Sequence, residues 1–235
     1  MNPTRVTRPI PLILTALVAF FSAVGALAVS NGSADAHGHD SHATTAMTVG
    51  NSPVVSQKAV ALHDNMRKLW EDHITWTRLA IISLEGDTPD TEATVGRLLE
   101  NQADIGNAVK PFYGEAAGNA LTQLLREHIL IAADVIAAAK AGDSTGLADA
   151  QERWLANADQ IAAALHSLNP RNWPLDVMTS EMHMHLDLTT EEAVAHLQGD
   201  WEADVAAYDK VHGHILHMAD LLSNGLIKQF PSRFR

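Results

Sequence analysis

Cysteine is absent from all 235 residues of this chain. The protein therefore holds no disulfide, no cysteine-type zinc site, no iron–sulfur cluster and no c-type haem attachment. Aromatic residues are also scarce, at 5%, whereas alanine and leucine are common. This balance favours helices over sheets. A chain of this length can bury a sizeable core without disulfides, so we expect one domain with short appendages.

Basic residues are outnumbered, with 16 Lys and Arg against 28 Asp and Glu and a formal net charge of −12. Because no basic patch accumulates, nucleic acid is not an expected partner. The sequence also lacks a dinucleotide fingerprint, a P-loop, a Gly-x-Ser-x-Gly motif, a His-Glu-x-x-His motif and an EF-hand loop. The absence of nucleotide, transferase and hydrolase motifs makes an enzyme the less favoured interpretation.

Residues 1–36 have the layout of a secretory signal peptide. Arg5 and Arg8 precede a long apolar run, and small-residue cleavage sites follow at 26–28 and 34–36. We therefore expect a secreted protein that resides outside the cell, in the periplasm or at the cell envelope. The apolar run is also long enough for an uncleaved anchor, and membrane contact is expected only in that case.

Residues 37–52 form a polar, histidine-rich tail that we expect to be disordered. If cleavage follows Ala36, the new N-terminus reads His37-Gly38-His39. The α-amine of His37, two backbone amides and the imidazole of His39 can then form a square-planar nitrogen site, which suits Cu(II) or Ni(II). The alternative interpretation is a solvated linker that happens to hold histidines.

Residues 53–235 are predicted to form an all-α domain. Apolar residues recur at spacings of three and four along five long segments, with a short helix before the last of them. The long segments cover 53–84, 91–109, 115–141, 144–168 and 189–227, and the short helix covers 175–186. Thr189 and Glu192 have the spacing of a capping box at the start of the last helix. These patterns predict an up-down helical bundle of four to five long helices plus a short one.

Polar side chains occupy positions that this periodicity assigns to the core. His73 lies in the middle of the first apolar seam, and His128 lies in the seam of the third helix. On the last helix, Asp204 and His212 fall on one side of the apolar stripe. Because buried polar groups must find partners, we expect these four side chains to meet one another.

This convergence has three interpretations. Inward side chains on facing helices are how bundles build metal sites, which points to a metal-binding or metal-sensing protein of the cell envelope, with copper first and zinc second. The same side chains could instead be a satisfied polar network in a non-catalytic structural or interaction module. The third interpretation is a haem b or redox bundle with His73 and His128 as axial ligands. Paired Glu-x-x-His motifs are absent, so a di-iron site fits poorly.

A second candidate metal site lies on the predicted short helix. Met182, His183 and His185 combine thioether and imidazole ligands, which suit Cu(I). The alternative is ordinary core packing, in which methionine fills gaps. Further along the chain, His214 is expected to face solvent.

Four segments carry a resemblance to known proteins: 69–78 (LWEDHITWTR), 110–114 (KPFYG), 153–159 (RWLANAD) and 227–231 (IKQFP). From about residue 62 to residue 234, the chain resembles an uncharacterised bacterial family of small helical proteins. Its members are often labelled glycosyltransferase or acetylglutamate kinase. The resemblance supplies no site residues, and both labelled activities would need a nucleotide-binding fold that this helical pattern does not provide.

Overall fold

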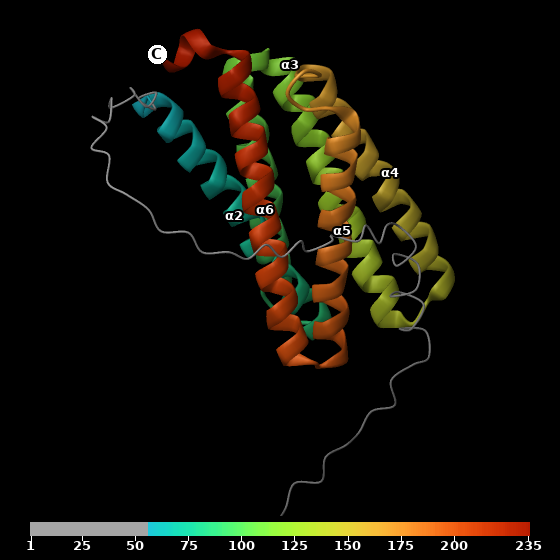
Figure 1. Ribbon diagram of the computed structural model, residues 1–235. Coiled ribbons are helices and arrows are strands. Elements are labelled where there is room, and N and C mark those ends of the chain that lie inside the picture. Colours follow the sequence, from blue (N-terminus) through green and yellow to red (C-terminus); the bar gives the residue numbers. More distant parts are fainter. Residues whose placement is uncertain (1–55) are drawn as a thin grey trace, which may run out of the picture.

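The computed structural model describes residues 56–235, which form five α-helices and no strand. In chain order the elements are α2 (Gln57–Gly86), α3 (Thr91–Ala141), α4 (Ser144–Leu168), α5 (Leu175–Gln198), α6 (Trp201–Gln229) and the short 3-10 helix η1 (Pro231–Phe234) (Figure 1). The predicted all-α class and helical bundle are confirmed. The predicted signal peptide and the whole predicted tail, with His37 and His39, lie outside the described residues.

The helices form a closed ring of neighbours. α2 packs against α3, α3 against α4, α4 against α5 and α5 against α6. The ring closes where α6 returns to pack against α2, so the first and last described helices lie side by side (Figure 1). This arrangement turns the apolar stripe of every helix toward one shared interior.

α3 is a hairpin of two antiparallel arms. Gly114 separates the arms with a left-handed φ of +85°. A Cβ on Gly106 would lie 2.6 Å from the carbonyl oxygen of Gly118, and a Cβ on Gly118 would lie 2.7 Å from that of Gly106. The arms thus approach as closely as only glycine permits. The predicted separation into two helices is confirmed, although the turn falls at Gly114 because Pro111 still has helical geometry.

Thr189 and Glu192 do not cap a helix, so the predicted boundary between 175–186 and a helix opening at Thr189 is wrong. Thr189 lies inside α5, where its hydroxyl donates to the backbone carbonyl of His185 at 2.8 Å. Glu192 is buried and pairs with Arg78 of α2. Their spacing therefore does not mark a helix start, because Thr189 bonds to its own helix one turn back and Glu192 is held by a side chain of another helix.

The break between the last two helices comes at Gly199. Its left-handed φ of +71° ends α5, and Asp200 then caps α6 by accepting a hydrogen bond from the amide of Ala203 at 3.1 Å. The predicted core seam does not continue through this break. Trp201 and Val205 belong to the apolar periodicity that predicted one helix over 189–227 and would place both in the core, yet they are 60% and 54% exposed.

The core runs along the bundle axis and draws on every described α-helix. Its most completely buried apolar side chains include Ile74, Ile105, Ile161, Leu186 and Ile215. Among residues 56–235, no helix combines the length and the apolar character needed to cross a bilayer.

Gly225 of α6 lies against the buried indole of Trp173, in the connection between α4 and α5. A Cβ at position 225 would stand 2.0 Å from Nε1 and 2.7 Å from Cε2 of that indole. Because Trp173 is only 1% exposed and has little room to retreat, we expect Gly225→Ala to lower the free energy of unfolding by about 1–3 kcal/mol. Chemical denaturation measures the change.

Gly213→Ala on the same helix is the matched control, because no atom lies within 4 Å of a Cβ at that position. Alanine there should be neutral or slightly stabilising, since it has the higher helix propensity. Equal stability of the two variants would contradict the expected clash.

Candidate functional site

Four imidazoles from four helices meet inside the bundle, each near the middle of its helix or, for α3, of the second arm. They belong to His73 of α2, His128 of α3, His185 of α5 and His214 of α6, and all four are buried. The ring of His185 is central, with its centroid 5.6 Å from that of His73, 6.0 Å from that of His128 and 6.3 Å from that of His214. We refer to these four side chains as the histidine cluster.

Helical periodicity carries each histidine of the cluster inward. A residue three or four positions away lies on the same helix face, and a large buried apolar side chain occupies such a position beside every one of them. In the order of the cluster these neighbours are Trp70, Leu125, Met182 and Met218. The four imidazoles are therefore buried because they lie on the same helix faces as the apolar residues of the core.

His128 uses both of its ring nitrogens. Nδ1 lies 2.9 Å from Oδ1 of Asn157, whose own amide donates to the carbonyl of Leu124 at 3.1 Å. Because the amide oxygen faces the ring, Nδ1 is the donor. Nε2 accepts from the indole of Trp154 at 3.2 Å. These partners fix one neutral tautomer.

His73 accepts a hydrogen bond from an amide network on α3. Its Nδ1 lies 3.2 Å from Nε2 of Gln102, and that amide nitrogen also donates to the carbonyl of Leu98 at 2.8 Å. Asn101 supplies its side-chain oxygen to Gln102 and donates to the carbonyl of Leu69 at 3.0 Å. The neutral form of His73 is therefore the one that this network accommodates.

His185 and His214 are less completely paired. Among the described residues, Nδ1 of His185 has no hydrogen-bond partner although the atom is buried, and an unpaired buried polar atom costs about 1–3 kcal/mol. His214 donates from Nε2 to the backbone carbonyl of Glu181 at 3.0 Å, and its Nδ1 lies 3.6 Å from Oε2 of the same residue. The cluster therefore retains nitrogen acceptors that protein groups do not satisfy.

Burial keeps the cluster uncharged. Desolvation, with a smaller contribution from His128, lowers the pKa of His73 from 6.5 to about 3. Burial lowers the pKa of His128 to about 4 and takes that of His185 well below 6.5. It also lowers the pKa of His214, against the opposing charge of Glu181. At neutral pH the site gathers four neutral imidazoles, the form of histidine that binds metals.

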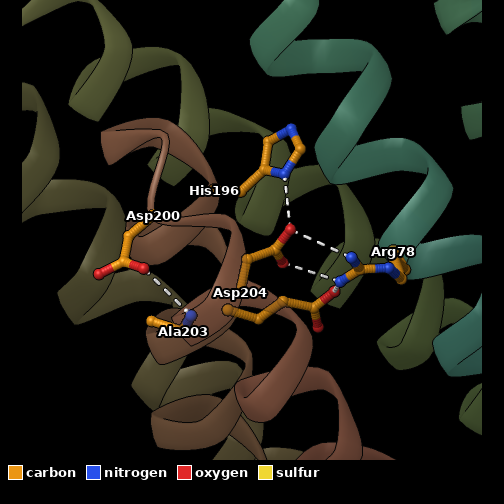
Figure 2. A network of polar contacts seen from close by, with 6 residues as sticks. Arg78, His196, Asp200, Ala203 and Asp204 are labelled. Atoms are coloured by element: carbon orange, nitrogen blue, oxygen red, sulfur yellow. Dashed lines mark hydrogen bonds and ion pairs between the residues drawn. The ribbon is translucent and has the colours of Figure 1, made fainter.

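A second polar network lies nearer the turn between α5 and α6. Arg78 of α2 donates to both carboxylate oxygens of Asp204, at 2.8 and 3.1 Å, and to Oε1 of Glu192 at 2.7 Å. Nδ1 of His196 lies 3.0 Å from Oδ2 of Asp204. Figure 2 shows Arg78 and His196 reaching the Asp204 carboxylate from different directions. We refer to Arg78, Glu192, His196 and Asp204 as the arginine network.

Carboxyl groups in and beside this network have shifted pKa values. Burial raises the pKa of Glu192 to about 7, although hydrogen bonding to Arg78 opposes the rise. Burial and the nearby Asp204 raise the pKa of Glu85 to about 8. For Asp204 burial acts upward, but the hydrogen bonds from Arg78 and His196 outweigh it and lower the pKa. The two glutamates therefore titrate near neutral pH.

The structure brings together two of the four side chains that the sequence predicted to converge. His73 and His128 both lie against the ring of His185. Asp204 instead belongs to the arginine network, because the guanidinium of Arg78 compensates its buried charge. His212 lies at the surface, with Nε2 3.3 Å from Oε1 of Glu71. Two residues along a helix point to nearly opposite sides, so His212 faces outward wherever His214 faces inward.

The predicted Met/His group divides between core and surface. Met182 and His185 are buried, and His185 joins the two seam histidines rather than forming a separate site. His183 points outward, with Nε2 2.7 Å from Oδ1 of Asp159. His214 was wrongly expected to face solvent, although its spacing of three from the buried Val211 places it on the apolar stripe.

Within residues 56–235, no group of three or more His, Asp or Glu side chains has an arrangement that could hold a metal ion as it stands. Several cluster nitrogens are engaged by amides and an indole instead. No protein-family model, curated protein or solved structure matches this chain. Its function is therefore inferred from the chemistry of the histidine cluster.

Proposed function

We propose that this protein is an exported helical bundle that binds a transition metal ion in the cell envelope, copper first and zinc second. The observation that carries the proposal is the histidine cluster, with neutral imidazoles from four helices. Facing helices of a bundle build metal sites in this way, and imidazole suits both metals. The tail histidines His37 and His39 would capture the ion, and the cluster would hold it.

The spacing of the rings supports a shared ion after small side-chain movements. Imidazoles bound to one ion, each nitrogen about 2 Å from it, have ring centres about 5 Å apart. The His185 ring is 5.6 Å from that of His73 and 6.0 Å from that of His128. Binding would require these rings to rotate and to give up hydrogen bonds to Gln102 and Trp154.

Copper ranks first because of the sulfur beside the site. Met182 lies three residues before His185 on α5 and is buried on the same face. Thioether sulfur and neutral imidazole together favour Cu(I), whereas zinc rarely takes a thioether ligand. His183 and His212, which point to the surface, are not part of the proposed site.

A second candidate function is a non-catalytic structural module of the envelope. The observation in its favour is that His128 has both nitrogens bonded and His73 has an amide partner. A network of this kind can fix the register of helices without a ligand. Haem b is less favoured, because a porphyrin between His73 and His128 would have to displace the ring of His185 that lies against both.

Titration with Cu(I) and with Zn(II) tests the proposal. We expect one ion to bind in the core more tightly than about micromolar. Tryptophan fluorescence should report it, because the rings of Trp70 and Trp154 lie 5.7 and 5.3 Å from those of His73 and His128. His185→Leu should abolish this signal, because it removes the central ring and leaves an apolar side chain that suits the core.

Two control variants separate this site from the surface histidines. His212→Ala on α6 should leave the fluorescence titration unchanged, because that imidazole lies outside the cluster. Combined His37→Ala and His39→Ala should remove only the binding by the tail. Absence of binding tighter than about micromolar would reject the metal hypothesis. Thermal stability that responds neither to chelator nor to added metal would favour the structural module, because a ligand of the native state must raise stability.

A further inference from the structure

A row of ligating side chains connects the histidine cluster to the surface along the seam between α5 and α6, which run antiparallel beside each other (Figure 1). His217 is 64% exposed, Glu181 is 19% exposed and His214 is 6% exposed. The Glu181 carboxylate bridges the two imidazoles, with Oε1 3.5 Å from Nε2 of His217 and Oε2 3.6 Å from Nδ1 of His214. The ring of His214 then stacks on that of His185. Exposure therefore falls steadily from solvent to cluster.

The inner step of this row joins two hydrogen-bond acceptors. His214 donates its Nε2–H to the backbone carbonyl of Glu181, so a neutral ring carries its lone pair on Nδ1. That lone pair faces Oε2 of the Glu181 carboxylate, an atom that is buried and has no hydrogen-bond partner among the described residues. Two facing acceptors do not stabilise each other, whereas a cation between them satisfies both.

Within residues 56–235, the other sides of the cluster offer no comparable route. The rings of His73 and His128 contact indoles and uncharged amides rather than carboxylates. The seam between α5 and α6 is the side on which groups able to bind a cation continue outward to an exposed imidazole.

We propose that His217, Glu181 and His214 form the access path along which a metal cation passes from solvent to the histidine cluster. The inference rests on the proposed metal binding and adds the route of uptake and release. The cation would first bind between His217 and Glu181, next between Glu181 and His214, and then pass to His185. Glu181 and His217 are positioning residues of this path and not final ligands.

Stopped-flow mixing of the full chain with Zn(II), and separately with Cu(I), tests the path through tryptophan fluorescence. We expect Glu181→Gln to slow uptake about tenfold, because the cation then lacks a compensating negative charge at the step between the two imidazoles, which raises the barrier along the path. Release into excess chelator should slow by the same factor, because a path acts equally in both directions. The dissociation constant should therefore remain nearly unchanged.

His217→Ala provides a second variant that cannot disturb the core, since its side chain is largely exposed. It should also slow uptake and release together. His183→Ala is the matched control, because this exposed histidine of α5 pairs with Asp159 away from the row. Its uptake rate should equal that of the wild type.

Each other outcome has a defined meaning. Faster release with unchanged uptake in Glu181→Gln would make Glu181 a final ligand and overturn the path. Wild-type rates in both Glu181→Gln and His217→Ala would place the route elsewhere and also overturn it. If the wild-type protein binds neither metal, the proposed function fails as well. Failure of the path alone leaves wild-type binding intact, so the two failures are distinguishable.

Discussion

Arg78→Met is expected to lower the free energy of unfolding by about 3–5 kcal/mol, the range for removing one partner of a buried ion pair. The side chains of Glu192 and Asp204 are only 2% and 4% exposed and share this guanidinium. Without it, two carboxylates remain out of water with much less compensation. The arginine network joins α2 to both α5 and α6, so global unfolding in urea or guanidinium chloride reports the loss.

Restoring charge balance should rescue the variant. Glu192→Gln and Asp204→Asn, added to Arg78→Met, replace the two unpaired buried carboxylates with neutral amides. We therefore expect the triple variant to recover much of the lost free energy of unfolding. Arg153→Met is the matched control, because this guanidinium pairs with Asp134 and Asp149 at the surface. Its stability should hardly change. Equal free energies of unfolding for Arg78→Met and Arg153→Met would contradict the proposed contribution of the arginine network to stability.

Stability should also pass through a maximum at about pH 6, because buried histidines and buried glutamates change the free energy of unfolding in opposite directions as the pH changes. The histidine cluster sets the acid side. In the folded chain the pKa is about 3 for His73 and about 4 for His128, against 6.5 for the ordinary side chain. Between these folded-state pKa values and 6.5, the two histidines bind protons in the unfolded chain but stay neutral in the folded chain. Stability therefore falls as the pH falls. At about 1.4 kcal/mol per pKa unit, the two histidines remove several kcal/mol.

Buried glutamates set the alkaline side of the profile. The pKa of Glu192 is about 7 and that of Glu85 about 8, against an ordinary value of 4.5. Over this interval the folded chain keeps protons that the unfolded chain has already released, so stability falls as the pH rises. The histidines dominate at pH 5, and the glutamates dominate once the histidines of the unfolded chain are neutral.

Denaturation curves measured across this pH range check the profile, and two variants separate its limbs. Glu85→Gln should flatten the alkaline limb, because it removes the group with the higher of the two raised pKa values. His185→Leu should flatten the acid limb, because burial and the neighbouring imidazoles lower the pKa of His185 well below its ordinary value, and the variant removes this group. A profile that rises or falls steadily from pH 4 to pH 9 would contradict this interpretation.

Much of the helical architecture was predictable because it depends on local spacing. Apolar periodicity and the stops at Gly142 and Asn169 locate α4, and the turn at Gly114 separates the arms of α3. The boundary between α5 and α6 was missed, although Gly199 followed by Asp200 is a local signal for it. The capping spacing of Thr189 and Glu192 was misleading because Glu192 pairs with Arg78 of another helix, and no pattern within one helix reveals such a partner.

The candidate site was predictable only in part, for a related reason. Periodicity along one helix places His73 and His128 in the interior but does not say which side chains face each other across it. The ring of His185 meets those of His73 and His128 because α5 faces α2 and α3 across the interior, and Asp204 is bound instead by Arg78 of another helix. His214 could have been found from its spacing to Val211 and Met218, because all three share one face of α6.

The closure of the ring between α2 and α6 has a consequence for biogenesis. A chain that emerges from the ribosome N-terminus first must make α2 long before α6 appears, and until then His73 and its apolar neighbours have an open side. Completion of the core waits for this distant pairing, and such nonlocal contacts slow folding. If the chain is exported unfolded, as we propose, that delay would keep it competent for translocation. The proposed metal site would then assemble only after delivery, away from the metal pool of the cytoplasm.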